Sequence, residues 1–363
     1  MSNSRITGQV RVVGAGLLGA SIGHALVGRG VDVILEDASP SNLTLAIDYG
    51  AGRRSDAADS PSLVIVAVPP DVTATTVAAE LSRWPDALVT DVASVKGTVL
   101  DSLVAARVPI DRYLGSHPMA GRERGGAIAA RADLFLGRPW VIAEHEFTTG
   151  TQLRTIEDLA LDLGAVPLTM TAAEHDRGVA LVSHVPQVVS SLLARRLAQA
   201  PENAISLTGQ GLRDTTRIAA SNPELWVQIL GANAPAVHAQ LSAYRDDLDA
   251  VLSALADPDA AGARRAIAET LAGGNAGVAR IPGKHGQAKH FSQLVVMVDD
   301  RPGELARLLT EIGELGVNME DLRLEHSPGA EIGLAEIAVL PEVEESLITQ
   351  LTARGWKIAG ALS

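Results

Sequence analysis

Residues 10–19 read Val-Arg-Val-Val-Gly-Ala-Gly-Leu-Leu-Gly, a short apolar run that ends in three glycines spaced Gly-x-Gly-x-x-Gly. Val10–Val13 predicts a strand, and the Ala-, Leu- and Ile-rich segment after the glycines predicts a helix. In this setting Gly14 permits a tight turn, Gly16 lets the backbone approach a pyrophosphate, and Gly19 packs the helix on the strand. Free N–H groups at the start of the helix attract phosphate. The pattern therefore predicts a dinucleotide at this turn.

Acidic residues after the second predicted strand indicate which dinucleotide is bound. Val31–Leu35 is followed by Glu36 and Asp37, and Asp37 lies 18 residues after the last glycine of the motif. A carboxylate here accepts hydrogen bonds from the ribose 2′-hydroxyl and repels a 2′-phosphate, so NAD is favoured over NADP. Asp37 is the better ribose ligand and Glu36 the second, whereas Arg53 and Arg54 are expected in a solvated loop. The other cofactor-binding candidates lie at the start of the helix or at strand ends: Leu17, Leu18, Val68, Pro69 and Ser94.

The first 170 residues alternate predicted strands and helices. Such alternation is typical of an α/β domain built on an open, mostly parallel, doubly wound sheet of the Rossmann type. Further strands are expected at 63–68, 88–91, 113–115, 140–143 and 165–168. We therefore assign residues 1–170 to an NAD-binding domain.

The remaining chain predicts two more domains. Residues 171–280 show no strand-like alternation, and their Ala- and Leu-rich segments recur at helical spacing, which predicts an all-helical substrate and dimerisation domain. Its large apolar surface suggests an intertwined homodimer. A Gly-rich stretch at 273–287 has little periodicity, and the linker is placed at 281–289. Residues 290–363 predict a small βαββαβ domain.

The composition excludes several classes of protein. The chain of 363 residues is 47% apolar, has a formal net charge of −13 and contains no cysteine. Lack of cysteine rules out disulfides, thiolate catalysis and Cys-ligated metal sites, and no metal site is expected. The acidic balance without a long basic run argues against nucleic acid as a partner. Neither a membrane span nor a signal-peptide layout is evident, so we expect a cytoplasmic protein.

The stretch Gly-Ser-His-Pro-Met-Ala-Gly-Arg-Glu-Arg-Gly-Gly at 115–126 places His117 in a loop that small residues hold and Pro118 stiffens. A histidine titrates near neutrality and can take the proton of a hydroxyl. A base beside a nicotinamide suggests that an alcohol is oxidised.

A second group of polar residues, Asp91-x-x-Ser94-x-Lys96, ends a predicted strand, where ligands of such sheets collect. Ser94 is placed to orient His117 or the nicotinamide amide, and as the alternative it caps a helix. Lys96 either pairs with Asp91 or reaches a substrate carboxylate. The sequence leaves both alternatives open.

The helical region carries a third group. His184 and Gln187 are three residues apart and share a helix face. Arg213 and Arg217 stand four apart in an otherwise apolar segment, and a guanidinium is suited to grip a carboxylate with two hydrogen bonds. Surface salt bridges to neighbouring acidic residues are the alternative.

Together these motifs resemble the prephenate dehydrogenase family of the tyrosine pathway, which includes arogenate dehydrogenases, in a form with a C-terminal ACT domain. The resemblance spans nearly the whole chain and depends on the order and spacing of five motifs. They are the early Gly-x-Gly-x-x-Gly, Asp91-x-x-Ser94-x-Lys96, Ser116-His117-Pro118-Met119-Ala120-Gly121-x-Glu123, Glu174-His175-Asp176 with Ser183-His184-x-Pro186, and Arg213-Asp214-x-Thr216-Arg217-Ile218-Ala219 with Trp226.

The resemblance implies the oxidative decarboxylation of prephenate to 4-hydroxyphenylpyruvate with NAD. His117 would accept the proton of the ring hydroxyl while hydride passes to NAD, and Ser94 would position His117 and the nicotinamide. Arg217 would bind a substrate carboxylate. The rest of the substrate pocket would be formed by Arg213, His184, Gln187, Glu123 and Arg122.

Two departures from the family bear on the substrate. Gln187 stands where the family often has a second histidine, and its amide carbonyl suits the ammonium group of arogenate. Arg122 stands where a small hydroxyl residue is common, and its positive charge favours prephenate. We favour prephenate and keep arogenate as the alternative.

The C-terminal segment resembles an ACT module in its turns, Asp300-Arg301-Pro302-Gly303-Glu304-Leu305 and Gly316-Val317-Asn318. The resemblance implies that tyrosine binds there and inhibits the enzyme. The alternatives are a purely structural module and, for the whole chain, a non-catalytic sensor of NAD and an amino acid.

Overall fold

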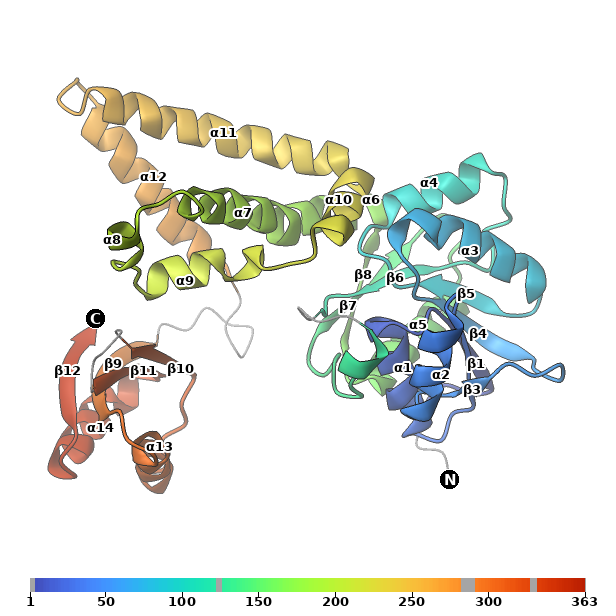
Figure 1. Ribbon diagram of the computed structural model, residues 1–363, viewed down its shortest axis with the longest axis horizontal. Coiled ribbons are helices and arrows are strands. Elements are labelled where there is room, and N and C mark those ends of the chain that lie inside the picture. Colours follow the sequence, from blue (N-terminus) through green and yellow to red (C-terminus); the bar gives the residue numbers. More distant parts are fainter. Residues whose placement is uncertain (1–3, 122–125, 282–290, 327–331, 363) are drawn as a thin grey trace. The chain divides into compact units, whose positions relative to one another are not determined.

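The computed structural model describes residues 4–121, 126–281, 291–326 and 332–362 (Figure 1). Contacts divide the chain into two compact units, Met1–Gln199 with Thr216–Tyr244, and Ala200–Thr215 with Arg245–Ser363. Each unit contains a hydrophobic core of its own. The predicted boundaries at 170, 280 and 290 stay predictions.

The first unit is built on a five-stranded parallel sheet in the order β3-β2-β1-β4-β5. Because the order reverses between β1 and β4, a crevice for ligands is expected at the carboxyl ends of the strands. This confirms the predicted doubly wound sheet. The strands are β1 (Gln9–Val13), β2 (Val33–Glu36), β3 (Arg53–Arg54), β4 (Pro61–Val66) and β5 (Leu88–Asp91).

Helices cover both faces of this sheet (Figure 1). In β4, Leu63 and Ile65 join the core on one face, and Val64 and Val66 join the core on the other, as alternation along a strand requires. The first core includes residues of α1 (Leu17–Val27), α2 (Pro40–Asp48) and α5 (Gly150–Asp162), and the second includes residues of α3 (Pro70–Arg83) and α4 (Gly97–Ala105).

A three-stranded sheet follows, formed by β6 (Gly115–Pro118), β7 (Pro139–Glu144) and β8 (Val166–Thr171), with the 3-10 turn Ala127–Ala129 between β6 and β7. His117 lies in β6, opposite Val141, so the prediction of a loop was wrong. The reason is that the apolar strand β7 offers hydrogen-bonding partners to a segment that has no strand pattern of its own. The strand expected at 113–115 begins only at Gly115, and Tyr113 forms a single bridge with Val89.

Arg53 and Arg54 form the edge strand β3, so the loop expected there was wrong as well. Arg53 forms ion pairs with Asp32 at 2.7 Å and with Asp59 at 2.5 Å. Two carboxylates therefore balance its charge at the edge of the sheet.

Residues 171–280 are helical, as predicted. Gly273 and Gly274 lie inside α12, so the expected break at 273 was wrong; glycine costs an exposed helix only about 1 kcal/mol, and helix-forming alanines surround this pair. The predicted linker lies, but for Ile281 at its start, outside the described residues. The helices are α6 (Ala172–Val179), a π-helical turn (Ala180–His184), α7 (Val185–Leu197), α8 (Glu202–Ile205), α9 (Gln210–Thr216), a 3-10 turn (Arg217–Ala219), α10 (Pro223–Ala232), α11 (Ala234–Ala256) and α12 (Ala263–Val278).

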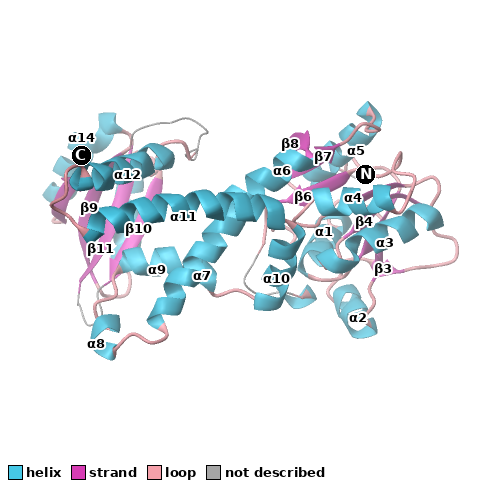
Figure 2. Cartoon of the chain, turned by 90° about the horizontal axis from the view of Figure 1, so that it is seen from above, coloured by secondary structure: helices cyan, strands magenta, loops and turns pink. Residues whose placement is uncertain are grey.

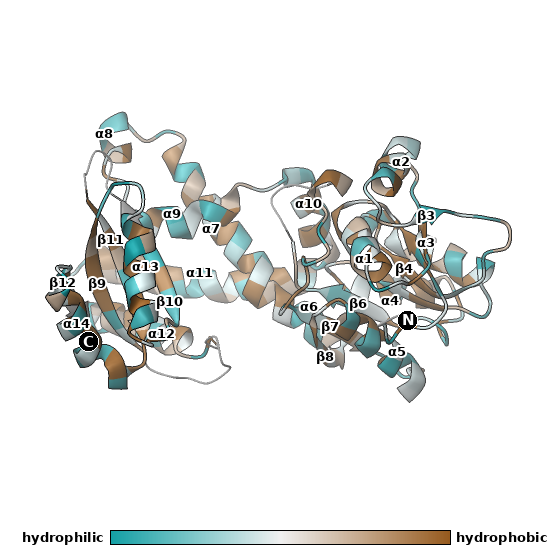
Figure 3. Ribbon diagram, turned by 90° about the horizontal axis from the view of Figure 1, so that it is seen from below, coloured by the Kyte–Doolittle hydropathy of each residue, from teal (hydrophilic) through white to brown (hydrophobic). Residues whose placement is uncertain are grey.

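The C-terminal segment has the predicted order of elements, βαββαβ, and its strands form an antiparallel sheet in the order β10-β11-β9-β12. Figure 2 shows β9, β11 and β10 of this sheet beside one another. Strand β9 is largely hydrophobic (Figure 3). Its residues Leu294, Val296 and Val298 belong to a core that both helices of the segment complete. The elements are β9 (Ser292–Asp299), α13 (Glu304–Glu314), β10 (Asp321–His326), β11 (Ile332–Val339), α14 (Pro341–Ala353) and β12 (Lys357–Leu362). Within the described ranges, no helix is both long and apolar enough to cross a bilayer.

Candidate active site

The glycine-rich turn between β1 and α1 contains two packing glycines and one that faces open space. Gly14 has a φ of +102°, and a Cβ there would lie 2.3 Å from the carbonyl oxygen of Ala67. A Cβ on Gly19 would lie 1.8 Å from the carbonyl oxygen of Gly14. A Cβ on Gly16 would meet nothing within 4 Å, so the N-terminus of α1 opens onto space that suits a phosphate group.

Asp37 is held at this turn by the backbone. Its carboxylate accepts hydrogen bonds from the N–H groups of Ala15 and Ser39, each at 2.7 Å. Glu36 instead forms an ion pair at 3.2 Å with the buried Arg11. Asp37 therefore remains the better candidate for the ribose hydroxyls. Among the other cofactor candidates, Leu17 and Leu18 begin α1, and Val68 and Pro69 follow β4 at the same edge of the sheet.

A buried ionic network joins β5 to β6. The side chains of Lys96 and Asp91 are 1% and 0% exposed and form an ion pair. Lys96 also donates to the carbonyl oxygen of Ser116 at 2.6 Å, and the Tyr113 hydroxyl donates to Asp91 at 2.7 Å. Burial lowers the pKa of Lys96, an effect that the Asp91 carboxylate opposes. Of the two alternatives for Lys96, the structure shows the pair with Asp91, and this network fixes the backbone just before His117.

His117 is half-buried and is held by a second histidine. Its Nδ1 lies 2.9 Å from Nε2 of His175, and the two rings meet edge to face with centroids 5.1 Å apart. Burial lowers the pKa of His117 well below its usual value, and nearby His175, Lys96 and His184 lower it further. The His117 imidazole is therefore neutral at pH 7.

Asp176 completes this arrangement. His175 Nδ1 lies 2.8 Å from Oδ1 of Asp176, and the same carboxylate accepts the backbone N–H groups of Lys96 at 2.9 Å and Gly97 at 2.8 Å. Burial raises the pKa of Asp176, but the hydrogen bonds from His175, Lys96 and Gly97 outweigh it and lower the pKa below the usual range. Asp176 is thus ionised and caps the N-terminus of α4.

Ser94 is half-buried in the loop between β5 and α4. The helix begins at Gly97, with Lys96 in the N-cap position, so the alternative that Ser94 caps it was wrong. Among the described residues, His117 Nδ1 is held by His175 and not by Ser94. The role of Ser94 toward the nicotinamide stays a prediction.

His184 and Gln187 lie where the π-helical turn passes into α7. Burial lowers the pKa of His184 to about 4, so its ring is neutral at pH 7. Asn233 Nδ2 lies 3.2 Å from His184 Nδ1 and also donates to the carbonyl oxygen of Asp176. Because that amide nitrogen can only donate, His184 keeps its proton on Nε2 and is a hydrogen-bond donor there.

Arg213 and Arg217 were expected to share one helix, but they do not. Helix α9 ends at Thr216, and Arg217 begins a 3-10 turn, so the predicted i, i+4 pair was wrong. Arg217 is exposed and forms no ion pair within the described part of the chain. Arg213 belongs to the second unit, and its place in the substrate pocket stays a prediction. Arg122 and Glu123 lie outside the described residues.

No functional role was predicted for His175, Asp176 or Asn233. The adjacent His and Asp of Glu174-His175-Asp176 were a usable signal, because that pair is suited to orient a further histidine. No local pattern marks Asn233, which lies 57 residues from Asp176 in the sequence.

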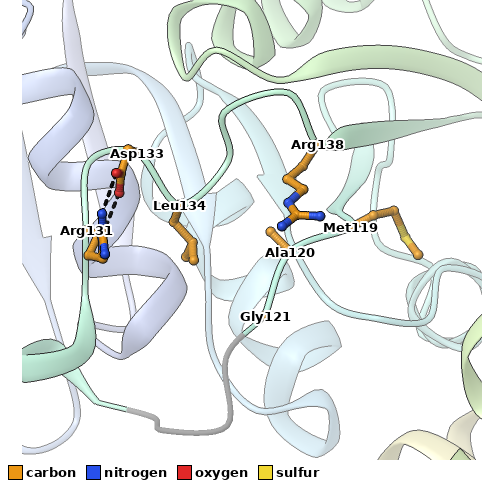
Figure 4. Close-up of a pocket in the computed structure, with 7 residues that line it drawn as sticks. All are labelled: Met119, Ala120, Gly121, Arg131, Asp133, Leu134 and Arg138. Carbon is orange, nitrogen blue, oxygen red and sulfur yellow. Dashed lines mark hydrogen bonds and ion pairs between the residues drawn. The ribbon is translucent and has the colours of Figure 1, made fainter. Parts of the chain in front are cut away.

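A cavity of about 410 Å³ adjoins the residues that follow β6 (Figure 4). The Arg138 side chain points toward Ala120, and Arg131 forms an ion pair with Asp133 at 2.6 Å. The cavity is lined by Met119, Ala120, Gly121, Arg131, Asp133, Leu134 and Arg138.

A glycine-rich turn after β1, an acidic residue held at that turn and a neutral histidine in β6, next to the carboxyl end of β5, are typical of an NAD-dependent dehydrogenase. Two family models match the chain: the nucleotide-binding domain of prephenate dehydrogenase over residues 22–168, and its dimerization domain over residues 171–269. The chain is 35% identical over 358 residues to the probable prephenate dehydrogenase NovF of Streptomyces niveus, covering 95% of this chain and 98% of that protein. The chain belongs to the prephenate dehydrogenase family.

Solved structures agree with this assignment. Prephenate dehydrogenase from Aquifex aeolicus in complex with hydroxyphenyl propionate and NAD+ matches with a TM-score of 0.66 and 25% identity, over 75% of this chain and 99% of that chain. Arogenate dehydrogenase from Synechocystis matches with a TM-score of 0.63 and 28% identity, over 74% of this chain and 99% of that chain. About a quarter of the present chain is therefore additional to these two structures.

Proposed function

We propose that this protein catalyses the NAD-dependent oxidative decarboxylation of prephenate to 4-hydroxyphenylpyruvate, a step of tyrosine biosynthesis, in the cytoplasm. Family membership supports the reaction, and the relatives include a prephenate dehydrogenase solved with NAD+. The observation that carries the proposal is His117, a neutral imidazole held in β6 next to the carboxyl end of β5, where the nicotinamide ring is expected.

The residues present suit this chemistry. Prephenate is a cyclohexadienol with a ring carboxylate and a pyruvyl side chain. NAD, when bound at Gly14, Gly16, Gly19 and Asp37, supplies the acceptor for the hydride that leaves the carbinol carbon. His117 takes the hydroxyl proton as the hydride leaves. The bond to the ring carboxylate then breaks to release carbon dioxide, its electron pair completes the aromatic ring, and the resulting phenolate oxygen takes the proton back from His117. The protein must therefore hold two anions and receive one proton.

Binding of the two carboxylates falls to the helical region in this proposal. Arg217 is exposed and without an ion pair among the described residues, which leaves its guanidinium free for a substrate carboxylate. His184 offers an N–H donor from a neutral ring and so adds no ground-state charge. Arg213, Glu123 and Arg122 are proposed for the remainder of the pocket on the resemblance alone.

One observation keeps arogenate as the second candidate substrate. The side-chain nitrogen of Gln187 donates to Ser221 Oγ at 2.7 Å, which leaves its carbonyl oxygen free to accept. An amide oxygen accepts from the ammonium group of arogenate and has nothing to donate to the keto group of prephenate. The Synechocystis relative is named an arogenate dehydrogenase.

We also propose that the C-terminal βαββαβ segment is an ACT domain that binds tyrosine. Its topology and two left-handed glycines support this: Gly303 has a φ of +95° before α13, and Gly316 has a φ of +70° in the turn that follows.

The homodimer is proposed from the match to a dimerization domain and from apolar side chains exposed on the helices. These are Leu181, Val182, Leu192, Val227, Leu248, Leu252, Leu255 and Leu271.

The test is NADH formation by the purified protein with NAD, on prephenate and on arogenate in parallel, each with and without tyrosine. Turnover of prephenate in preference to arogenate supports the proposal, and the reverse preference selects arogenate. Binding of NAD without turnover of either substrate would refute the dehydrogenase and favour a sensor of NAD and an amino acid.

A further inference from the structure

The hydrogen bonds around His117 form a chain whose protons can be assigned one by one. Asp176 accepts two backbone N–H groups as well as a contact from His175, so it is an ionised carboxylate with no proton to donate. His175 Nδ1, 2.8 Å from that carboxylate, must therefore carry a proton. In a neutral imidazole the other nitrogen is then bare, so His175 Nε2 is an acceptor.

The assignment continues to His117. Its Nδ1 lies 2.9 Å from the bare Nε2 of His175, so His117 Nδ1 donates and carries the proton. His117 Nε2 is left with a free electron pair. With His175 neutral, the direction of every hydrogen bond in this chain thus follows from the charge on Asp176.

We propose that His175 and Asp176 are positioning residues that fix His117 in the tautomer with a bare Nε2, the atom that takes the proton of the substrate hydroxyl. The inference rests on the proposed function for the identity of that hydroxyl. The tautomer itself depends only on groups of this chain.

The burial of His175 supports its proposed role in positioning His117. His175 is 1% exposed, and both of its ring nitrogens are used, one toward His117 of β6 and one toward Asp176 of its own helix, α6. Burial and the nearby positive charge of Lys96 oppose a positive charge on His117. Once His117 has accepted a proton, the negative charge of Asp176, reached through His175, is the group that stabilises the resulting imidazolium.

The competing arrangement has the opposite direction. If His175 were an imidazolium, both of its nitrogens would donate, His117 Nδ1 would accept, and the proton of neutral His117 would lie on Nε2. His117 would then be unable to act as a base at that atom.

The first experiment reads the tautomer without any substrate. The full-length protein is labelled with ¹⁵N-histidine, and the ring nitrogens of His117 are assigned by comparison with the His117→Asn variant. We expect a protonated Nδ1 and a bare Nε2 for His117 at pH 7, and the same for His175. A protonated Nε2 on His117 would overturn the proposal.

The second experiment reads the consequence for catalysis. His175→Leu removes the acceptor, and we expect kcat to fall roughly 10- to 100-fold, within the contribution of a positioned general base, with KM little changed. His175→Gln offers an amide oxygen to His117 and should restore part of kcat. The matched control is His145→Gln, a half-buried histidine whose ring nitrogens pair with the Tyr113 carbonyl and the Phe147 N–H and whose ring lies against the rings of Tyr113 and Phe147. His145 lies outside the hydrogen-bond chain of His117 and His175. We expect it to leave kcat unchanged.

These experiments distinguish a positioning role of His175 toward His117 from a purely structural role. Thermal unfolding of each variant shows whether it is folded, and a folded His175→Leu variant with wild-type kcat and an unchanged pH profile would overturn the proposal. If the wild type turns over neither prephenate nor arogenate, the proposed function fails, while the ¹⁵N spectrum still decides the tautomer.

Discussion

At the scale of single residues, the three glycines of the first turn do different work. Gly14 and Gly19 are required by the fold, because a Cβ at either position would overlap backbone atoms. Gly16 faces open space, so the protein itself has no steric need for glycine there. A requirement for glycine at this position must come from a ligand.

Gly16→Ala is therefore expected to leave the free energy of unfolding within about 0.5 kcal/mol of wild type while the Kd for NAD rises at least about tenfold. Urea unfolding and an NAD titration measure the two quantities. Gly14→Ala is the contrasting variant: its φ of +102° alone should cost about 1–3 kcal/mol of stability. Unchanged NAD affinity in Gly16→Ala would show that the pyrophosphate does not approach this glycine.

The lowered pKa of His117 predicts the acid side of the pH profile. Burial penalises the imidazolium, so the neutral base persists to lower pH than in an unperturbed histidine. We expect kcat/KM to stay level from pH 8 down to about 6.5, the unperturbed value, and to fall only below it. The measurement is initial NADH formation in overlapping buffers. An acid limb with its midpoint above 6.5 would contradict the electrostatics described for His117.

Arg217 is expected to act in binding more than in the chemical step. A clamp that held the departing carboxylate tightly would stabilise the ground state and slow decarboxylation. Arg217→Ala should therefore raise KM at least about tenfold and lower kcat much less. Arg154→Ala, an exposed arginine on α5, is the control for the loss of one positive charge. A large loss of kcat at unchanged KM would instead show that Arg217 stabilises the transition state.

At the scale of elements, the position of β6 depends on the ionic network beneath it. Lys96→Met would leave Asp91 buried without its counter-charge, and breaking a buried ion pair in this way costs about 3–5 kcal/mol. We expect the lower end, because Asp91 keeps the hydrogen bonds from Tyr113 and Ala93. Urea unfolding measures the loss, and Lys96→Met combined with Asp91→Asn should recover part of it. A Lys96→Met variant as stable as wild type would show that the network does not hold β6.

The same elements show what the sequence could predict. The apolar strands of the parallel sheet and the helices of the central region follow from their periodicity, and the Gly-x-Gly-x-x-Gly turn was placed correctly. Strand β6 could not be predicted, because its polar and small residues become a strand only by pairing with β7. The cap of α4 was equally hidden, since Asp176 lies 80 residues from Lys96 in the sequence. His117 was singled out as the candidate base, which stays a prediction, but the histidine that contacts it, His175, was given no role.

At the scale of the whole molecule, the C-terminal segment has the features of an added module. It has a hydrophobic core of its own, formed by residues 294–358. The family models end at residue 269, and the two solved relatives match over about three quarters of this chain. Nothing in the chemistry proposed for His117, His175 and Arg217 draws on this segment.

Deletion of residues 288–363 is therefore expected to leave NADH formation from prephenate within about threefold of the full-length rate and to abolish inhibition by tyrosine. The physical reason is that the deletion removes a separate core together with the proposed effector site, and leaves the nucleotide-binding sheet and His117 untouched. Initial rates with and without tyrosine measure both effects, and an unchanged Kd for NAD serves as the control for folding of the first unit. If the truncated enzyme were still inhibited by tyrosine, the effector would bind outside the βαββαβ segment, and that segment would be a structural module. If the full-length enzyme were insensitive to tyrosine as well, the effector proposal itself would fail, while the proposed reaction at His117 would stand.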